Sequence, residues 1–229
     1  MPERVLFFID AGFLSKISKH FGKGKYIKFK IKDFIKNICS NNGFAAEKVF
    51  YYTAPPYQSN NPGKSQAKRK ESYDKFKDSL IKEGFIFREG RCQRLKIDGN
   101  FIYKQKGVDT LLTIDLSHIK EDYPKIKRII LVSSDTDFVP VIEDIKKRNI
   151  EIVLFTYFDR KRGSPFSLSN HLLKACSRWV KLKPKDFHEV LTYANSGKIS
   201  KDAILDILVD LILGKKIELK KYSKKLQKH

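Results

Sequence analysis

Cysteine is scarce in this chain of 229 residues, and the placement of the three cysteines excludes two kinds of stabilised small domain. Cys39, Cys92 and Cys176 are odd in number and far apart in the sequence. They form neither a disulfide framework nor the ligand set of a cysteine-based zinc site. The fold must therefore depend on a conventional hydrophobic core, for which a hydrophobic content of 41% is sufficient.

Long hydrophobic runs are also missing. No stretch approaches the roughly 18 consecutive apolar residues that indicate a membrane-spanning helix. The apolar run at residues 5–9 is short and is interrupted by Asp10, so it does not have the form of a signal peptide. We therefore expect a soluble, cytoplasmic protein without a membrane partner.

The motifs of several phosphate and nucleotide chemistries are absent as well. Residues 197–200 (GKIS) lack the first glycine of a G-x-x-x-x-G-K-S/T loop, and no G-x-G-x-x-G opens a helix. Asp10 is followed by Ala11 and Gly12 rather than by the D-x-D of aspartate-nucleophile phosphatases. The five histidines share no metal-ligand spacing, and no nucleophile–base pair is evident. These absences disfavour nucleotide-loop, dinucleotide and covalent hydrolytic mechanisms.

Acidic residues are few relative to basic ones. The chain has 47 Lys and Arg against 26 Asp and Glu, which gives a formal net charge of +21. Such an excess is costly in self-repulsion and is typical of proteins with a polyanionic partner, nucleic acid before an acidic membrane surface. A lysine-rich proteome would produce the same composition without any such partner. Charge alone thus favours nucleic-acid binding over other interactions.

Alternating strand and helix patterns predict an α/β domain. Continuous apolar runs at residues 5–9, 129–132 and 150–155 suit strands that are buried on both faces, as in a parallel sheet. Weaker patterns predict strands at 50–53 and 85–87 and helices at 31–42, 65–83, 109–119 and 138–148. We expect the α/β domain to cover residues 1–183. Residues 184–229 are expected to form a small, lysine-rich appendage with a helix at 203–213.

Three aspartates follow predicted strands. Asp10 ends the first strand, and Asp135 and Asp137 come just after the strand at 129–132. Ligands of open parallel sheets bind at the carboxyl ends of the strands, so neighbouring strands would bring these carboxylates together. Packed carboxylates repel one another unless a cation neutralises them, and Mg²⁺ or Mn²⁺ is the natural partner for oxygen ligands. The alternative is that each aspartate is only a turn residue or the N-cap of a helix.

Basic and aromatic residues interleave around a predicted β-hairpin at residues 94–104, which turns at Asp98-Gly99-Asn100. Basic side chains give affinity for phosphates, and aromatic rings can stack on single-stranded bases. The candidate residues are Arg94, Lys96, Lys104 and Lys106 around the hairpin and Arg69 near the start of the helix predicted at 65–83, with Tyr51, Tyr52, Tyr57, Phe101 and Tyr103. Core packing for any one ring and a solvated surface for any one lysine are alternatives, so only the cluster argues for binding.

Three segments resemble the signature blocks of NYN domains, and they occur in the order found in that family. They are FIDAGFL at residues 8–14, KGVDTLLTIDL at 106–116 and LVSSDTDFVPVI at 131–142. The resemblance is closest to the LabA-like branch, and residues 166–182 are similar to the closing helix and strand of the family. It implies a PIN-like (Rossmannoid) three-layer fold with a mainly parallel central sheet.

The resemblance also implies a metal-dependent ribonuclease. Asp10, Asp109, Asp135 and Asp137 would form the catalytic metal site for Mg²⁺ or Mn²⁺. Asp115 also matches a family position, although it lies about 240° around its helix from Asp109. Its alternative role is to support the metal-binding residues or to cap a helix. Ser133, Ser134 and Lys106 are expected to contact the substrate beside these acids.

The chain departs from the family pattern at one place near the first acid. Many relatives carry Asn two or three residues after the first Asp, where this chain has Gly12 and Phe13. A non-catalytic RNA-binding or regulatory protein therefore remains an alternative to the ribonuclease. A nuclease acting on DNA is a second alternative, because charge does not distinguish the two nucleic acids. A homodimer is possible.

Overall fold

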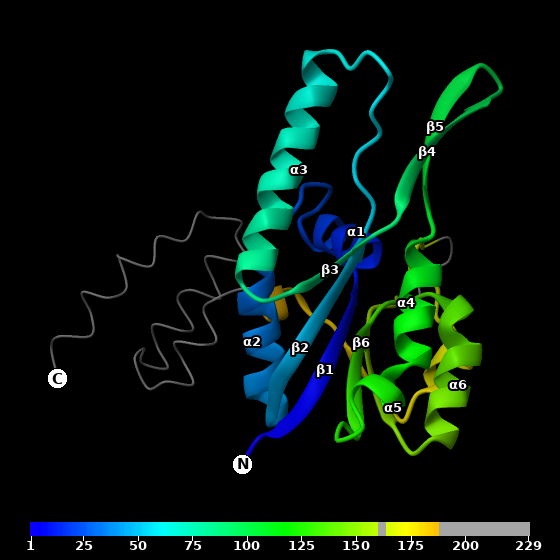
Figure 1. Ribbon diagram of the computed structural model, residues 1–229. Coiled ribbons are helices and arrows are strands. Elements are labelled where there is room, and N and C mark those ends of the chain that lie inside the picture. The colour runs from blue at the N-terminus through cyan, green and yellow to red at the C-terminus, as the bar shows by residue number, and fades with distance from the viewer. Residues whose placement is uncertain (160–163, 188–229) are drawn as a thin grey trace, which may run out of the picture. The chain divides into compact units, whose positions relative to one another are not determined.

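The computed structural model describes residues 1–159 and 164–187, and its elements are labelled in Figure 1. Contacts divide the chain into two units. The first contains Met1–Tyr26 and Ala45–Leu182, and the second contains Ile27–Phe44 and the chain from Lys183 onward. The first unit is an α/β fold built on a mostly parallel sheet, which confirms the predicted fold class.

Six strands form the central sheet. In spatial order they are β3 (Ile86–Glu89), β2 (Phe44–Thr53), β1 (Glu3–Asp10), β6 (Arg128–Val132), β7 (Glu151–Thr156) and β8 (Arg178–Lys181). β6 pairs in parallel with both β1 and β7, and β2–β3 and β7–β8 are also parallel. The two central neighbours are thus β1, which ends at Asp10, and β6, which Asp135 and Asp137 follow, as the acidic pattern predicts.

Both faces of the central strands are buried. Successive side chains of a strand point to opposite sides, so the residues of each strand are divided between the two faces. Leu6, Phe8, Leu131 and Leu154 belong to one core cluster, which also contains apolar residues of the helices α4 (Val108–Ser117), α6 (Val139–Lys147) and α7 (Asn170–Ala175). The alternate residues of these strands, such as Phe7 at 0% exposure, are equally buried. This explains the continuous apolar runs in the sequence.

Two helix boundaries follow local capping signals. Asp10 caps α1 (Ala11–Phe21), a helix that the sequence patterns above did not predict. The predicted helices at 31–42 and 65–83 are confirmed as α2 (Ile31–Asn42) and α3 (Lys64–Lys82), and the left-handed Gly43 ends α2 at φ 71°. The remaining helical segments are α5 (Ile119–Asp122), η1 (Thr136–Phe138) and η2 (Pro184–Phe187).

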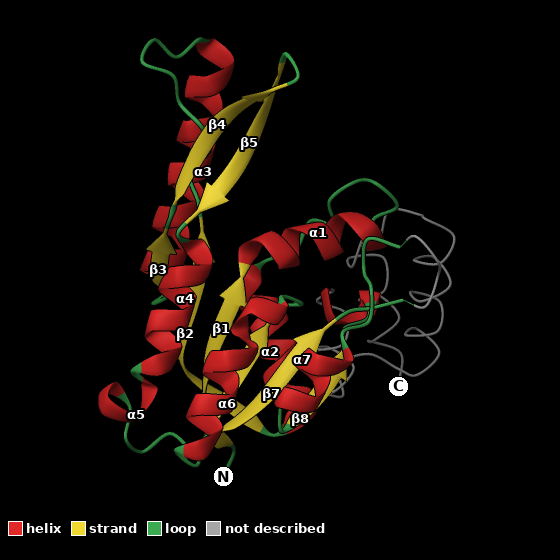
Figure 2. Cartoon of the chain, turned by 90° about the vertical axis from the view of Figure 1, so that its right-hand side faces the viewer, coloured by secondary structure: helices red, strands yellow, loops and turns green. Residues whose placement is uncertain are grey.

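Two strands form a separate hairpin outside the central sheet. β4 (Arg91–Ile97) and β5 (Asn100–Lys106) pair antiparallel around Asp98 and Gly99, which have φ of 49° and 79°. Two central turn residues with positive φ are the signature of a type I′ turn, so the predicted hairpin is confirmed and extends further than expected. Figures 1 and 2 show that the hairpin and α3 both extend beyond the carboxyl ends of β1 and β2.

The second unit contains α2 and η2. Phe34 of α2 packs against Phe187 with ring centroids 5.0 Å apart, and Asn37 donates a hydrogen bond to the carbonyl oxygen of Asp186. The predicted helix at 203–213 and most of the predicted appendage lie outside the described residues. Among the described helices, none has the length and apolar composition needed to cross a bilayer.

Candidate active site

The ends of β1 and β6 bring two of the predicted acids together through a buried serine. Ile9 is paired with Val132, so Asp10 and Ser133 follow at neighbouring positions. The Ser133 hydroxyl donates to Oδ2 of Asp10 at 3.1 Å and accepts the backbone N–H of Asp135 at 3.2 Å. Ser133 has 0% exposure, which corrects the expectation that it contacts substrate. Its hydroxyl instead holds Asp10 and Asp135 in place, while Ser134 is partly exposed beside them.

Both aspartates also cap helical turns, which was the alternative role considered from the sequence. Oδ1 of Asp10 accepts the N–H of Phe13 at 3.1 Å, and Oδ1 of Asp135 accepts the N–H of Asp137 at 3.0 Å. A carboxylate has about four lone-pair positions, so one or two such bonds leave acceptor capacity for a ligand. Capping therefore fixes the direction of these side chains and leaves acceptor positions on their carboxylates for a ligand.

The electrostatics group Asp109 with the other three acids. Burial raises the pKa of Asp10, with a smaller contribution from the charge of Asp109, while the hydrogen bonds from Phe13 and Ser133 act in the opposite direction. Desolvation raises the pKa of Asp109, and repulsion by Asp135 and Asp137 adds to it. Asp109 is in the first turn of α4, as the sequence predicts. The four carboxylates thus interact electrostatically at one edge of the sheet.

Asp115 is not brought together with these four. Its carboxylate accepts the Tyr52 hydroxyl at 2.8 Å, and it forms a two-pronged ion pair with the Arg88 guanidinium at 2.9 and 2.7 Å. A bidentate arginine–carboxylate pair is among the stronger polar contacts in proteins. Asp115 therefore joins α4 to β2 and β3, which agrees with the supporting role considered for it from the sequence.

The predicted aromatic cluster separates into buried and exposed rings. Tyr51 and Tyr52 are only 7% and 0% exposed, so the hypothesis that they stack on bases is wrong. Their strand enters the core, where Tyr52 packs beside Phe8. Phe101 and Tyr103 are 54% and 53% exposed on the hairpin and remain available.

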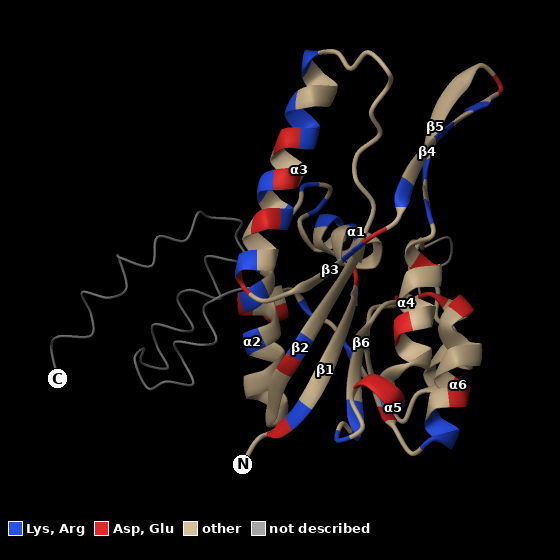
Figure 3. Ribbon diagram, viewed as in Figure 1, with Lys and Arg blue, Asp and Glu red and all other residues tan. Residues whose placement is uncertain are grey.

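The predicted basic contacts lie on α3 and on the two faces of the hairpin. Arg69 is exposed on α3. Cross-strand pairing puts Arg94 and Lys96 on one hairpin face and Lys104 and Lys106 on the other. Figure 3 shows Lys and Arg positions along the hairpin and along α3, where Asp and Glu positions alternate with them.

Gln105 and Gly90 lie close to segments that carry the acids, and neither had a signal in the sequence patterns. A Cβ placed on Gly12 would lie 3.2 Å from Oδ1 of Asp10 and 3.8 Å from Oε1 of Gln105, so the base of the hairpin reaches the first acid. A Cβ on Gly90 would lie only 2.4 Å from the carbonyl oxygen of Lys106 and 3.0 Å from the backbone nitrogen of Val108. Gly90 thus allows the close approach of the segment that begins α4. Only the hairpin register, extended to its base, could have indicated Gln105.

The donor set fits a hydrated divalent cation better than a fully coordinated one. Within the described part of the chain, no three His, Cys, Asp or Glu side chains form a ready-made metal site. Mg²⁺ keeps several of its waters and is usually held by one or two carboxylates, so it does not need a three-residue cage. The raised pKa values of Asp10 and Asp109 mean that added positive charge would relieve unfavourable interactions.

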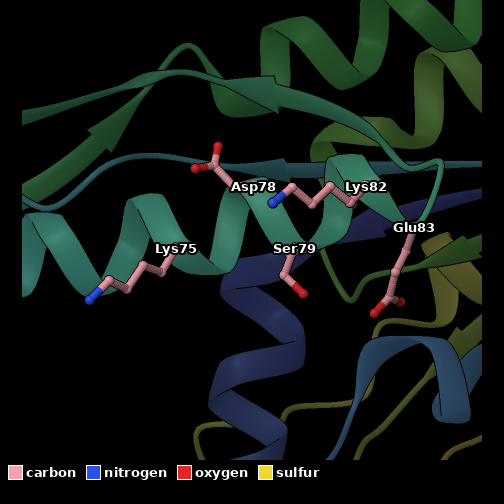
Figure 4. A pocket seen from close by; sticks show the side chains of 5 residues that line it. All are labelled: Lys75, Asp78, Ser79, Lys82 and Glu83. Atoms are coloured by element: carbon pink, nitrogen blue, oxygen red, sulfur yellow. The ribbon is translucent and has the colours of Figure 1, made fainter.

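A separate hollow of about 410 Å³ lies along the C-terminal half of α3 (Figure 4). It is lined by Lys75, Asp78, Ser79, Lys82 and Glu83. The charges of its two lysines and two acids balance, so it lacks the excess positive charge that would attract phosphates. We assign no role to it in the site.

The raised pKa of Asp109 predicts a stability effect with a defined sign. A carboxyl whose pKa is raised by folding makes the folded protein less stable as pH rises from the ordinary pKa of 3.8 through the pKa of the folded state. At neutral pH the charged Asp109 is therefore unfavourable, and Asp109→Asn should raise Tm. The gain should shrink as pH falls through 3.8 and disappear below about pH 3, where both states are mostly protonated. Thermal unfolding at neutral pH and at the acidic pH tests this, with Asp78→Asn on the exposed surface of α3 as the control. Equal gains in Tm for Asp109→Asn and Asp78→Asn would contradict it.

Comparisons with known proteins agree with this architecture. The sequence profile of the NYN domain matches residues 4–183. No curated protein matches the chain. Among solved structures, a protein of unknown function from Vibrio parahaemolyticus RIMD 2210633 is 20% identical, with a TM-score of 0.53 over 81% of this chain and 96% of that one. That likeness concerns the fold, whereas the profile identifies the family. The chain belongs to the NYN domain family, whose members have a PIN-like, nuclease-like fold.

Proposed function

We propose that this protein is a metal-dependent endoribonuclease of the LabA-like branch of the NYN family. The observation that carries the proposal is the electrostatic interaction among four aspartates: Asp10, Asp135 and Asp137 at the carboxyl ends of β1 and β6, and Asp109 in the first turn of α4. An acidic group in a chain of net charge +21 combines a place for cations with surroundings that attract a polyanion. RNA phosphodiesters are the substrate class that fits both features.

The four aspartates would surround a hydrated Mg²⁺ or Mn²⁺ ion that keeps several of its waters, and Asp115 would take no part because Arg88 already neutralises it. In such a site a divalent cation supplies an activated water and positive charge for the phosphodiester. Asp10 and Asp135 contribute fixed carboxylates, since the buried Ser133 hydroxyl and two backbone N–H groups set their positions. Asp137 and Asp109 are more exposed and would face the substrate side.

The basic residues would hold the phosphates on either side of the reacting bond. Lys106 lies two residues before the first turn of α4, which carries Asp109, so its ammonium group is suited to the phosphate nearest the acids. Residues further away add affinity that falls with salt and carries little sequence information. They are Arg69, Arg94, Lys96 and Lys104.

Cleavage of a mixed panel of nucleic acids tests the function. End-labelled single-stranded RNA, hairpin RNA and DNA of the same sequence would each be incubated with Mg²⁺, Mn²⁺ or a chelator. We expect cleavage of RNA with either metal and none with the chelator. Internal products, rather than shortening from one end, would identify an endonuclease. Cleavage that persists in the chelator would contradict metal dependence, and equal cleavage of the DNA would favour the nuclease without RNA specificity.

A non-catalytic RNA-binding protein is the second candidate. Gly12 replaces a polar residue of many relatives, and Phe13 at the next position is buried at 5% exposure, with its N–H bonded to Asp10. Neither residue offers a side-chain amide beside the acids. Salt-sensitive RNA binding without cleavage under any metal condition would select this candidate.

A further inference from the structure

The β4–β5 hairpin exposes three consecutive large apolar side chains. Phe101, Ile102 and Tyr103 are 54%, 41% and 53% exposed, and within the part of the chain that the structure describes the two strands pair only with each other. Its charges are mostly of one sign, with Asp98 at the turn against Arg91, Arg94, Lys96, Lys104 and Lys106. Exposed rings among positive charges match a ligand that has both flat apolar surfaces and negative groups.

The cross-strand register sorts these side chains onto two different faces. Arg94 is opposite Tyr103 and Lys96 is opposite Phe101, so one face consists of two adjacent cation–aromatic pairs. Ile102 is opposite Leu95 and belongs to the other face. The aromatic rings of β5 are therefore gathered on one side, which we call the stacking face.

Tyr57, from the loop before α3, completes the stacking face. Its ring lies 5.4 Å from that of Tyr103, centroid to centroid. The Arg94 guanidinium lies 4.9 Å from the Tyr57 centroid and 4.5 Å from the Phe101 centroid, so it bridges the two rings. These contacts hold the rings in place, and less side-chain entropy is lost when a ligand stacks on them.

The stacking face leads to the acidic site at the base of the hairpin. The next residue of this face along β5 is Gln105, whose Oε1 lies 3.8 Å from the position of a Cβ on Gly12. Oδ1 of Asp10 is 3.2 Å from the same position. Same-face residues of a strand repeat about every 7 Å. Tyr103 and Phe101 are therefore one and two such steps from Gln105, along a line that starts beside Asp10.

We propose that the stacking face (Tyr57, Arg94, Lys96, Phe101 and Tyr103) binds single-stranded RNA and guides it to the acidic site. Unpaired bases stack on the rings, and Arg94 and Lys96 contact the intervening phosphates. Bases inside a duplex have their faces covered by neighbouring pairs, so duplex RNA gains only the phosphate contacts. This inference rests on the proposed function, and it narrows the substrate class to unpaired RNA.

Fluorescence anisotropy with the full chain tests the proposal. Fluorescein-labelled oligouridine and an RNA duplex of equal length would be titrated with Asp135→Asn protein, in which cleavage is suppressed. The double change Phe101→Ala and Tyr103→Ala should raise Kd for oligouridine by about 5-fold or more per ring and leave Kd for the duplex nearly unchanged. Ile102→Ala is the matched control, because it removes an exposed apolar side chain from the opposite face of the same strand. Circular dichroism and Tm establish that both variants remain folded.

The salt dependence separates stacking from charge. The double aromatic variant should keep the parent slope of log K against log salt, whereas Lys96→Gln should reduce that slope by about one. Equal affinities of the double aromatic variant and Ile102→Ala for oligouridine would overturn the proposal, and so would an equal loss on the duplex. If hairpin-dependent binding is found without cleavage by the parent protein, the stacking face stands and the nuclease function fails. If cleavage is found and is insensitive to the hairpin changes, the nuclease stands and the stacking face fails.

Discussion

Replacing Asp135 by asparagine is expected to lower RNA cleavage by at least about 100-fold. Loss of a supporting residue around a metal typically costs 10- to 100-fold, so loss of a charged ligand should cost more. Asparagine caps helices as well as aspartate does, so the turn that begins with the N–H of Asp137 should survive. The variant therefore removes a charge from the site while keeping its backbone.

Initial rates of cleavage at saturating Mn²⁺ measure this effect. Asp78→Asn makes the same chemical change on the exposed surface of α3 and should leave the rate within about twofold of the parent. Asp10→Asn and Asp109→Asn should resemble Asp135→Asn. Unreduced cleavage by Asp135→Asn would contradict the assignment or reveal a contaminating nuclease.

A double variant distinguishes a cooperative site from independent contributions. Groups that act as one unit give strongly non-additive losses. Because Asp135 is one of the charges that raise the pKa of Asp109, the two carboxylates should behave in this way. The combined Asp109→Asn and Asp135→Asn protein should therefore be little slower than either single variant, rather than slower by the product of their losses.

Gly90→Ala is expected to lower the free energy of unfolding by about 1–3 kcal/mol and to slow cleavage by about 10- to 100-fold. The added Cβ would meet the carbonyl oxygen of Lys106 at 2.4 Å and Cγ2 of Val108 at 2.8 Å. Backbone atoms cannot rotate away, so the segment that begins α4 must move. Asp109 would move with it, and a displacement of about 1 Å can cost 100-fold in rate.

Urea unfolding and cleavage rates check this effect against Gly63→Ala. A Cβ on Gly63, the N-cap of α3, would have no neighbour within 4 Å, and the residue has an ordinary φ of −69°, so its replacement should change stability by less than about 1 kcal/mol. Similar behaviour of the two variants would indicate that Gly90 tolerates a side chain. It would also mean that the contact between Gly90 and Lys106 does not position Asp109.

The elements with strong local signals could be predicted from the sequence. The runs that became β1, β6 and β7 are apolar on both faces, and the hairpin has a turn sequence that favours positive φ at Asp98 and Gly99. The carboxyl-end placement of Asp10 and Asp135 followed from those strands. The patterns above do not predict α1, although the Asp10 cap at its start is a local signal.

The relations between distant segments were not predictable in the same way. The ion pair of Asp115 with Arg88 joins α4 to β3, and no periodicity in either segment indicates it. The burial of Tyr51 and Tyr52 depends on the position of β2 next to β1, which follows from the sheet order alone. The bridging hydroxyl of Ser133 likewise depends on a pairing between strands that are far apart in the chain.

That pairing has a consequence for how the protein emerges from the ribosome. Ser133 follows Asp10 by 123 residues, and the strand that Asp10 ends lies between β2 and β6 in the middle of the sheet. Translation at about 5–20 residues per second leaves β1 without its β6 neighbour for on the order of ten seconds. The nascent chain thus has no assembled acidic site while most of its mRNA is being translated. The activity proposed for the site can begin only after the segment that carries Asp135 and Asp137 has left the exit tunnel.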